Sequence, residues 1–201
     1  MLTPIDNHSV DLSLLPARAT VLDVGCRGFR FAEHFAALGH RVVAMDPGEE
    51  RPTFKEHWEL ISFLQSALVP DGMDGVGKLV LTADPEARHV VPWHVKVDHA
   101  PWQSVGCLSL TKVMRLCNVE EFDLAKFNME GGEFDILDRL HAPVLKQIVV
   151  SFHEHTSRRR GEAAVNGLVQ RLGKWYDVVR HEWDERYCAG RNAWDTVLVR
   201  R

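Results

Sequence analysis

The chain has 201 residues, the size of one ordinary globular domain, and its 45% hydrophobic and 26% charged residues are typical of a soluble protein. Its formal net charge of −4 argues against a nucleic-acid partner. No apolar run approaches the roughly 20 residues of a membrane-spanning helix, no export signal is visible, and the four cysteines lack CxxC pairs, so we expect a cytoplasmic protein with reduced thiols.

The elements follow from hydrophobic periodicity and from the glycines and prolines that interrupt it. Residues 1–19 are expected to be an irregular or weakly helical lead-in, and residues 20–201 a single domain. The expected strands are residues 21–25, 41–47, 78–84, 122–129, 146–154, 177–183 and 195–201. The expected helices are residues 29–39, 55–69, 109–119, 132–141 and 159–176. Residues 88–97 are a further extended segment that could pair with residues 78–84 as a hairpin.

This alternation determines the predicted fold class. Strands that alternate with helices pair in parallel through right-handed crossovers. The last two strands have only a loop between them, so they are expected to form an antiparallel pair. The sequence therefore predicts an α/β fold, a Rossmann-like, doubly wound and mostly parallel sheet with an antiparallel C-terminal edge.

The stretch VLDVGCRGF begins with a buried strand and ends in a turn with Gly25 and Gly28. In doubly wound sheets, ligands bind at the carboxyl ends of strands. Glycines there let the backbone approach a ligand and expose amides at the next helix. Asp46 ends the second strand roughly 20 residues further on, where an acid can accept hydrogen bonds from ribose hydroxyls. The alternative is a tight turn followed by a solvated acid.

The spacing of the turn favours a particular nucleotide. Asp23 occupies the place of the first glycine in a dinucleotide-binding motif, where it would repel a pyrophosphate and attract an ammonium group. S-adenosylmethionine carries an adenosine and an amino-acid end and no phosphate. No GxxxxGK[ST] motif is present, which argues against a P-loop NTPase.

Residues 21–29 and 41–47 resemble motif I and the second-strand acid of class I S-adenosylmethionine-dependent methyltransferases. Residues 109–137, followed by SFHEH at 151–155, resemble the FkbM methyltransferase family, which has a Lys-Ile-Asp-Val-Glu-Gly-Ala-Glu segment here. The resemblance spans about residues 20–155. Matching residues are Lys126, Asn128, Glu130, Gly131, Gly132, Glu133 and Leu137. Asn128 stands where the family has Asp, and the glycine spacing of CRGF is one residue shorter than the common form.

The resemblance implies a methyltransferase-like domain over residues 20–201 that uses S-adenosyl-L-methionine, with O-methylation of a small hydroxylated acceptor, such as a sugar or natural product. The cofactor-binding residues that it implies, together with the turn, are Asp23, Gly25, Cys26, Arg27, Gly28, Asp46, Ala83 and Asp84. Cys26 is equally explained as a small packing residue, since no partner that would activate it as a nucleophile is visible.

Methyl transfer is an in-line displacement in which the protein mainly positions the reactants, and a general base adds about 10²–10⁴-fold when the acceptor is a hydroxyl. Candidates at strand ends are His153 as base, Glu130 as orienter or acceptor ligand, and Asn128. A solvated strand end is the alternative. His153 and His155 have a metal-ligand spacing, but no third ligand is identifiable, so no metal is assigned.

Two other classes of protein are alternatives to a methyltransferase. The first, a nicotinamide dehydrogenase, would need a third glycine and a hydride-handling pair, and neither appears. A non-catalytic protein that retains the fold for binding or assembly is favoured by Asn128 alone.

Trp93 and Trp102 are packing residues or a stacking platform for a ring-bearing acceptor. The cations at 158–160 are a solvated cluster or bind an anionic acceptor.

Overall fold

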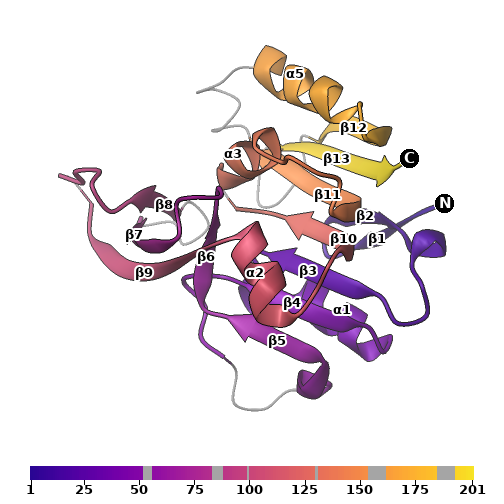
Figure 1. Cartoon of the computed structure of the whole chain (residues 1–201), viewed down its shortest axis with the longest axis horizontal. Helices are drawn as coiled ribbons and strands as arrows, with labels where there is room; N and C mark the ends of the chain where they lie inside the picture. The colour runs from indigo at the N-terminus through magenta and orange to yellow at the C-terminus, as the bar shows by residue number, and fades with distance from the viewer. Residues whose placement is uncertain (52–55, 83–87, 99, 130, 154–161, 185–192) are drawn as a thin grey trace.

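The computed structural model describes residues 1–51, 56–82, 88–98, 100–129, 131–153, 162–184 and 193–201 (Figure 1). In this part of the chain, seven strands form a central sheet in the order β12-β13-β11-β10-β3-β4-β5. They are β3 (Thr20–Val24), β4 (Arg41–Met45), β5 (Ile61–Leu64), β10 (Phe122–Phe127), β11 (Leu145–His153), β12 (Tyr176–Asp184) and β13 (Ala193–Arg200). β13 runs antiparallel to both of its neighbours, β11 and β12, and the other pairs in this sheet are parallel. The predicted fold class is confirmed.

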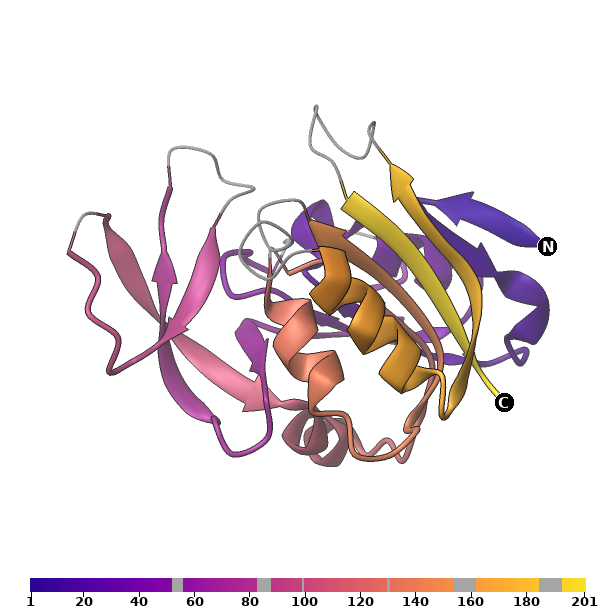
Figure 2. The same cartoon turned by 90° about the horizontal axis from the view of Figure 1, so that it is seen from above.

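Helices cover both faces of this sheet, which explains why its inner strands are nearly continuous apolar runs. The larger buried cluster lies under α2 (Leu110–Cys117), α3 (Gly132–Asp138) and α5 (Glu162–Leu172). The smaller cluster lies under α1 (Arg30–Ala37) on the opposite face. Figure 2 shows α3 and α5 side by side over the β11 end of the sheet. These helices and the strands β3, β4, β10, β11, β12 and β13 agree with the predicted elements within a few residues.

The N-terminal segment is a β-hairpin, so the expectation of an irregular or weakly helical lead-in was wrong. Strands β1 (Leu2–Ile5) and β2 (His8–Asp11) pair antiparallel. Asp6 and Asn7 form the turn with φ of 43° and 66°, the left-handed pair that a two-residue hairpin turn requires. Asp and Asn are the non-glycine residues that best tolerate this conformation. The two strands around them are too short to give a recognisable hydrophobic period in the sequence.

The hairpin is attached firmly to the central sheet. Ile5 and Val10 are buried in the smaller cluster. The Gln147 side chain on β11 accepts a hydrogen bond from the backbone N–H of Asp11 at 2.8 Å and donates one to its carbonyl at 3.1 Å. These contacts fix the Asp11 end of the hairpin to the amino-terminal part of β11.

The helix expected over residues 55–69 was also wrong. From residue 56 onward, this stretch contains a 3-10 turn, η3 (Trp58–Leu60), and two strands, β5 and β6 (Ser66–Val69). Ile61, Leu64 and Leu68 satisfy a helical period, but a short apolar run cannot distinguish helix from strand by itself. Pairing of β5 with β4 and of β6 with β9 (Trp102–Ser109) decides in favour of strands.

A second sheet of four strands, in the order β6-β9-β7-β8, stands beside the β5 and β10 region of the first (Figure 1). The expected hairpin is present as β7 (Gly75–Val80) and β8 (His89–Pro92). However, β7 belongs to this second sheet and is not a strand of the central one. Strand β9 was not predicted from the sequence, because Ser104 and Gly106 interrupt the apolar residues of this strand.

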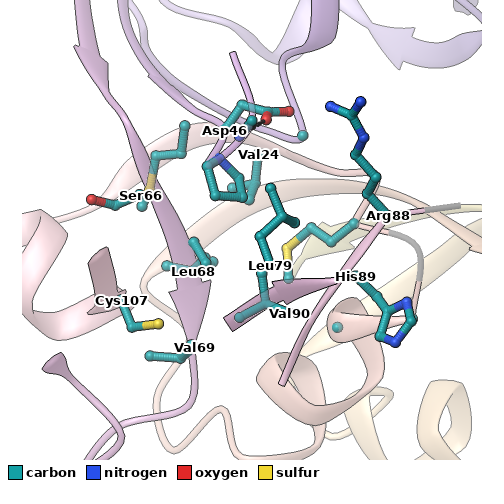
Figure 3. Close-up of a pocket in the computed structure, with 18 of the residues that line it drawn as sticks. Val24, Asp46, Ser66, Leu68, Val69, Leu79, Arg88, His89, Val90 and Cys107 are labelled. Carbon is teal, nitrogen blue, oxygen red and sulfur yellow. Dashed lines mark hydrogen bonds between the residues drawn. The ribbon is translucent and has the colours of Figure 1, made fainter. Parts of the chain in front are cut away.

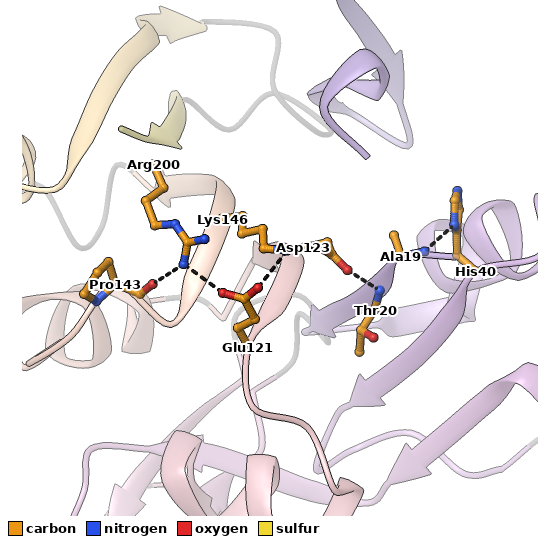
Figure 4. Close-up of polar contacts among 8 residues, drawn as sticks. All are labelled: Ala19, Thr20, His40, Glu121, Asp123, Pro143, Lys146 and Arg200. Atoms are coloured by element: carbon orange, nitrogen blue, oxygen red, sulfur yellow. Dashed lines mark hydrogen bonds and ion pairs between the residues drawn. The ribbon is translucent and has the colours of Figure 1, made fainter. Parts of the chain in front are cut away.

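Polar side chains at the amino ends of the central strands have a structural role (Figure 4). Asp123 accepts hydrogen bonds from the backbone N–H of Thr20 at 2.8 Å and from Lys146 at 2.7 Å. Glu121 accepts from Lys146 and from Arg200, at 2.7 and 2.8 Å. These hydrogen bonds lower the pKa of Glu121. They connect four strands at this edge, which leaves the carboxyl edge for ligand binding.

Candidate functional site

The turn after β3 brings three strand ends together. Gly25 has φ of 75° and donates its N–H to the Met45 carbonyl at the end of β4, at 2.9 Å. A Cβ on Gly25 would lie 1.8 Å from the carbonyl oxygen of Asn128, just after β10. Glycine is therefore required here both for its backbone conformation and for this close approach.

The second glycine has a different environment. Gly28 has φ of 68°, and a Cβ placed on it would meet nothing within 4 Å. Phe29 follows with φ of 59°, and its buried ring makes edge-to-face contacts with Trp58 and Phe63 at 5.2 and 5.1 Å. Phe29 thus anchors the turn while Gly28 faces open space beside the first turn of α1.

Asp23 lies beneath this turn and does not line the cleft. Its carboxylate is fully buried, and its Oδ1 is 2.9 Å from the Nζ of Lys126 on β10. The same ammonium donates to the Gly25 carbonyl at 2.7 Å. The pair is neutral as a unit, so Asp23 presents no net charge to a ligand, and its predicted contact with a cofactor stays a prediction. Its evident role is to hold Lys126, which orients the glycine turn.

Asp46 extends from the end of β4 into a cleft of about 1440 Å³ that also contains Gly25, Arg27 and Gly28. Its Oδ1 accepts the backbone N–H of Gly48 at 2.8 Å. Burial raises the pKa of Asp46, and the backbone hydrogen bonds from Gly48 and Glu49 oppose that shift. The glycine turn and the strand-terminal acid therefore converge on one cleft, as predicted.

The two sheets form opposite walls of this cleft (Figure 3). The central sheet contributes the ends of its inner strands, and the hairpin turn contributes Asp6 and Asn7. The second sheet and the residue before β8 contribute apolar side chains, among them Leu68, Val69, Leu79 and Val90, and the polar side chains of Ser66, Arg88 and His89.

His153, the predicted base, ends β11 and lines the same cleft, although the residue is only 3% exposed. Its Nδ1 lies 4.0 Å from Oε1 of Glu133, whose Oε2 accepts the backbone N–H of Gly131 at 2.9 Å. Glu133 is fully buried in the first turn of α3. The sequence indicated a favourable helix-dipole position for Glu133 but not its approach to His153.

His8 is a further buried titratable residue that the sequence analysis did not identify. It lies on β2, with Nδ1 3.5 Å from the Ser151 hydroxyl on β11. Burial, followed by the nearby charges of Lys126 and His153, holds the pKa of His8 well below its usual value. No local pattern could have indicated this, because 143 residues separate His8 from Ser151.

The other predicted residues fall into three groups. Asn128 lines the cleft and, among the described residues, its buried Oδ1 has no hydrogen-bond partner. Cys26 is buried outside the cleft lining, and burial raises the pKa of its thiol well above the usual value; this environment suits a packing residue, and its predicted contact with a cofactor stays a prediction. Ala83, Asp84, Glu130, His155 and the cations at 158–160 lie outside the described residues.

Trp93 and Trp102 pack edge to face at 5.5 Å on the second sheet. The Lys78 ammonium lies 5.3 and 5.0 Å from the two ring centres. The indoles are 50% and 40% exposed. The two indoles pack on each other, and Trp93 also lines the cleft, so both predicted roles, packing and a stacking platform, stay predictions.

Within the described ranges, no group of three His, Cys, Asp or Glu side chains is arranged to hold a metal ion. No helix in the same part of the chain is long and apolar enough to cross a membrane.

No protein-family model and no curated protein matches the chain. Several solved methyltransferases are similar in structure. One is the 1,6-didemethyltoxoflavin-N1-methyltransferase of Burkholderia thailandensis, at 17% identity and a TM-score of 0.44 over 91% of this chain and 71% of that one. Another is a TehB-like methyltransferase from Corynebacterium glutamicum, at 14% identity and a TM-score of 0.44 over 94% of this chain and 84% of that one. A third is an rRNA methylase from Streptococcus thermophilus, at 9% identity and a TM-score of 0.46 over 94% of this chain and 90% of that one.

Proposed function

We propose that this protein is an S-adenosylmethionine-dependent methyltransferase that binds its cofactor in the cleft between the two sheets. The observation that carries the proposal is the convergence of the Gly25–Gly28 turn and the Asp46 carboxylate on one cleft at the carboxyl ends of β3 and β4. This is the edge at which doubly wound sheets bind nucleotides.

The residues of the cleft fit the chemical groups of this cofactor. A carboxylate can accept about four hydrogen bonds, and the Gly48 and Glu49 backbone groups account for two at Asp46, which leaves capacity for ribose hydroxyls. Gly28 faces open space that a ligand can fill. Met45 and Leu79 offer apolar surface for the adenine base. When bound, the cofactor supplies an electrophilic methyl group.

The chain's own residues would position an acceptor and receive its proton. His153 lies at the cleft and takes the proton of an acceptor hydroxyl on a ring nitrogen. Glu133, 4.0 Å from Nδ1, stabilises the resulting imidazolium. The Asn128 side chain, whose buried oxygen has no partner within the described residues, hydrogen-bonds the acceptor. Glu130 stays a predicted orienter, and Cys26, Arg27, Ala83 and Asp84 stay predicted cofactor residues.

The acceptor that we propose is a small hydroxylated molecule, such as a sugar or natural product, in the cytoplasm. The net charge of −4 supports a small molecule over nucleic acid. The second candidate is a non-catalytic protein that keeps the fold for binding or assembly. It is favoured by Asn128, because an amide cannot supply a charge where the resembling family has a carboxylate.

Calorimetric titration with S-adenosylhomocysteine, beside NAD and NADP, tests the proposal. We expect the first to bind at micromolar affinity or better and the other two not to bind. Asp46→Ala should abolish binding, because the ribose hydroxyls lose their acceptor. If none of the three ligands binds to the folded wild-type protein, the glycines form only a turn, and the non-catalytic candidate replaces the methyltransferase.

A further inference from the structure

We infer that Arg88 is a cofactor-binding residue, supplied by the second sheet, that covers the adenosine end of the ligand held at Asp46. This rests on the proposed function and adds a role for a part of the chain that the resemblance does not assign.

Arg88 immediately precedes β8, and its side chain reaches across to the turn that follows β4. Its Nη1 lies 3.8 Å from the position that a Cβ on Gly48 would occupy. The Oδ1 of Asp46 and the Cδ2 of Leu79 each lie 3.5 Å from that same position. The guanidinium and the carboxylate therefore border the same point at one end of the cleft, with Leu79 beside them (Figure 3).

The guanidinium has no partner in the described part of the chain. Its Nε is buried without a hydrogen bond. Asp46 borders the same point of the cleft, but no ion pair joins it to Arg88 within 4.0 Å among the described residues. A buried, unsatisfied donor on a charged group costs more than a neutral one, so native proteins rarely keep such a donor without a function. A ligand in the cleft would supply the missing acceptor.

The surrounding charges indicate which ligand this is. Asp46 and Glu49 both line the cleft at this turn, and each would repel a phosphate or carboxylate. Adenosine is uncharged and offers ribose hydroxyls as donors to Asp46. It also offers ring nitrogens and an aromatic face to Arg88. A guanidinium is planar, carries five donors and stacks on aromatic rings, so it matches this set better than an ammonium would.

The consequence is that the second sheet is part of the cofactor site. Leu79 supplies apolar contact and Arg88 supplies donors, while Asp46 supplies the acceptor from the central sheet. The adenosine end would thus be enclosed by side chains from both sheets.

Calorimetry with S-adenosylhomocysteine and, separately, with adenosine tests this on Arg88→Met, Arg88→Lys and the control Arg115→Met. Arg115 is exposed on α2 and does not line the cleft. We expect Arg88→Met to weaken binding of both ligands by the same factor, about tenfold or more. Arg88→Lys should recover only part of the affinity, because it keeps the charge and loses the planar donors. Arg115→Met should bind like the wild type.

The folded state is checked by thermal unfolding, where we expect Arg88→Met to match the wild type because no intramolecular hydrogen bond is lost. If Arg88→Met is folded and binds both ligands with wild-type affinity, the inference is wrong and the proposed function survives. If it weakens S-adenosylhomocysteine but not adenosine, the assignment to the adenosine end is wrong. If the folded wild type binds neither ligand, the proposed function and this inference both fail.

Discussion

The buried ion pair beneath the glycine turn provides a quantitative test of how the site is built. The Nζ of Lys126 is 2.9 Å from Oδ1 of Asp23, and the two side chains are 3% and 0% exposed. Lys126→Met keeps most of the side-chain volume but leaves the Asp23 carboxylate buried without its cation. Removal of one member of a buried pair typically costs about 3–5 kcal/mol. We expect the free energy of unfolding to fall by this amount.

An exposed ion pair of nearly the same length is the matched control. The Nε of Arg201 is 2.8 Å from Oδ1 of Asp177, with side chains that are 59% and 67% exposed. Solvent screens such a pair, so Arg201→Met should cost at most about 1 kcal/mol. Because the two N–O distances are so similar, the difference between the variants measures the effect of burial.

Urea unfolding followed by fluorescence gives both values by linear extrapolation. The double variant Lys126→Met with Asp23→Asn removes both charges, and we expect it to recover part of the loss. A loss in Lys126→Met no larger than that in Arg201→Met would refute the reasoning. Under conditions in which Lys126→Met is folded, we also expect weaker binding of S-adenosylhomocysteine, because Lys126 donates to the Gly25 carbonyl at 2.7 Å.

Three further predictions follow from the same region. Gly25→Ala should destabilise the fold far more than Gly28→Ala in urea unfolding, because only at Gly25 would a Cβ meet backbone, at 1.8 Å; equal losses would contradict this. The lowered pKa of His8 means that the unfolded chain binds its proton more readily, so stability should fall as the pH drops below about 6.5, by up to about 1.4 kcal/mol per pH unit. His8→Gln should reduce that slope between pH 7.5 and 5.5, and an unchanged slope would show that His8 is not its source. His153→Asn should slow methyl transfer by about 10²–10⁴-fold and leave the affinity for S-adenosylhomocysteine unchanged; an unaltered rate would exclude His153 as the base.

The central sheet could be predicted because its signal is local. Strands buried on both faces are rich in apolar residues, as at Val21, Leu22 and Val24 and at residues 148–150. The short C-terminal connection likewise dictated an antiparallel pair, which β12 and β13 form. In each case the residues that determine the element are adjacent in the sequence.

Apart from the β7–β8 hairpin, the second sheet could not be predicted, because its other strands are decided by distant partners. Ser66–Val69 pairs with residues 106–109, about 40 positions further on. Locally, this segment fits a helical face as well as a strand, and only the pairing distinguishes them. The position of the N-terminal hairpin also depends on distant residues, because Asp11 is hydrogen-bonded to the side chain of Gln147.

The site shows the same division between local and distant information. The glycine turn and Asp46 have a recognisable spacing, so they could be predicted. Lys126 was noticed only as a matching residue, and its pairing with Asp23, 103 positions away, depends on β3 and β10 lying next to each other in the sheet. The approach of Arg88 to the cleft and the position of His8 against β11 depend on the second sheet and the N-terminal hairpin, two elements whose place in the fold no local pattern indicates.

These two elements border different parts of the cleft, and this suggests how its volume is divided. Arg88 and Leu79, from the second sheet and the residue before β8, border the same point as Asp46, near the end of β4. The hairpin contacts β11, which ends in His153, and its turn residues Asp6 and Asn7 line the same cleft. If the cofactor occupies the Asp46 end, the acceptor is left with the His153 end, where the hairpin turn forms part of the wall. A base at His153 is then on the acceptor side, as proton removal from a hydroxyl requires.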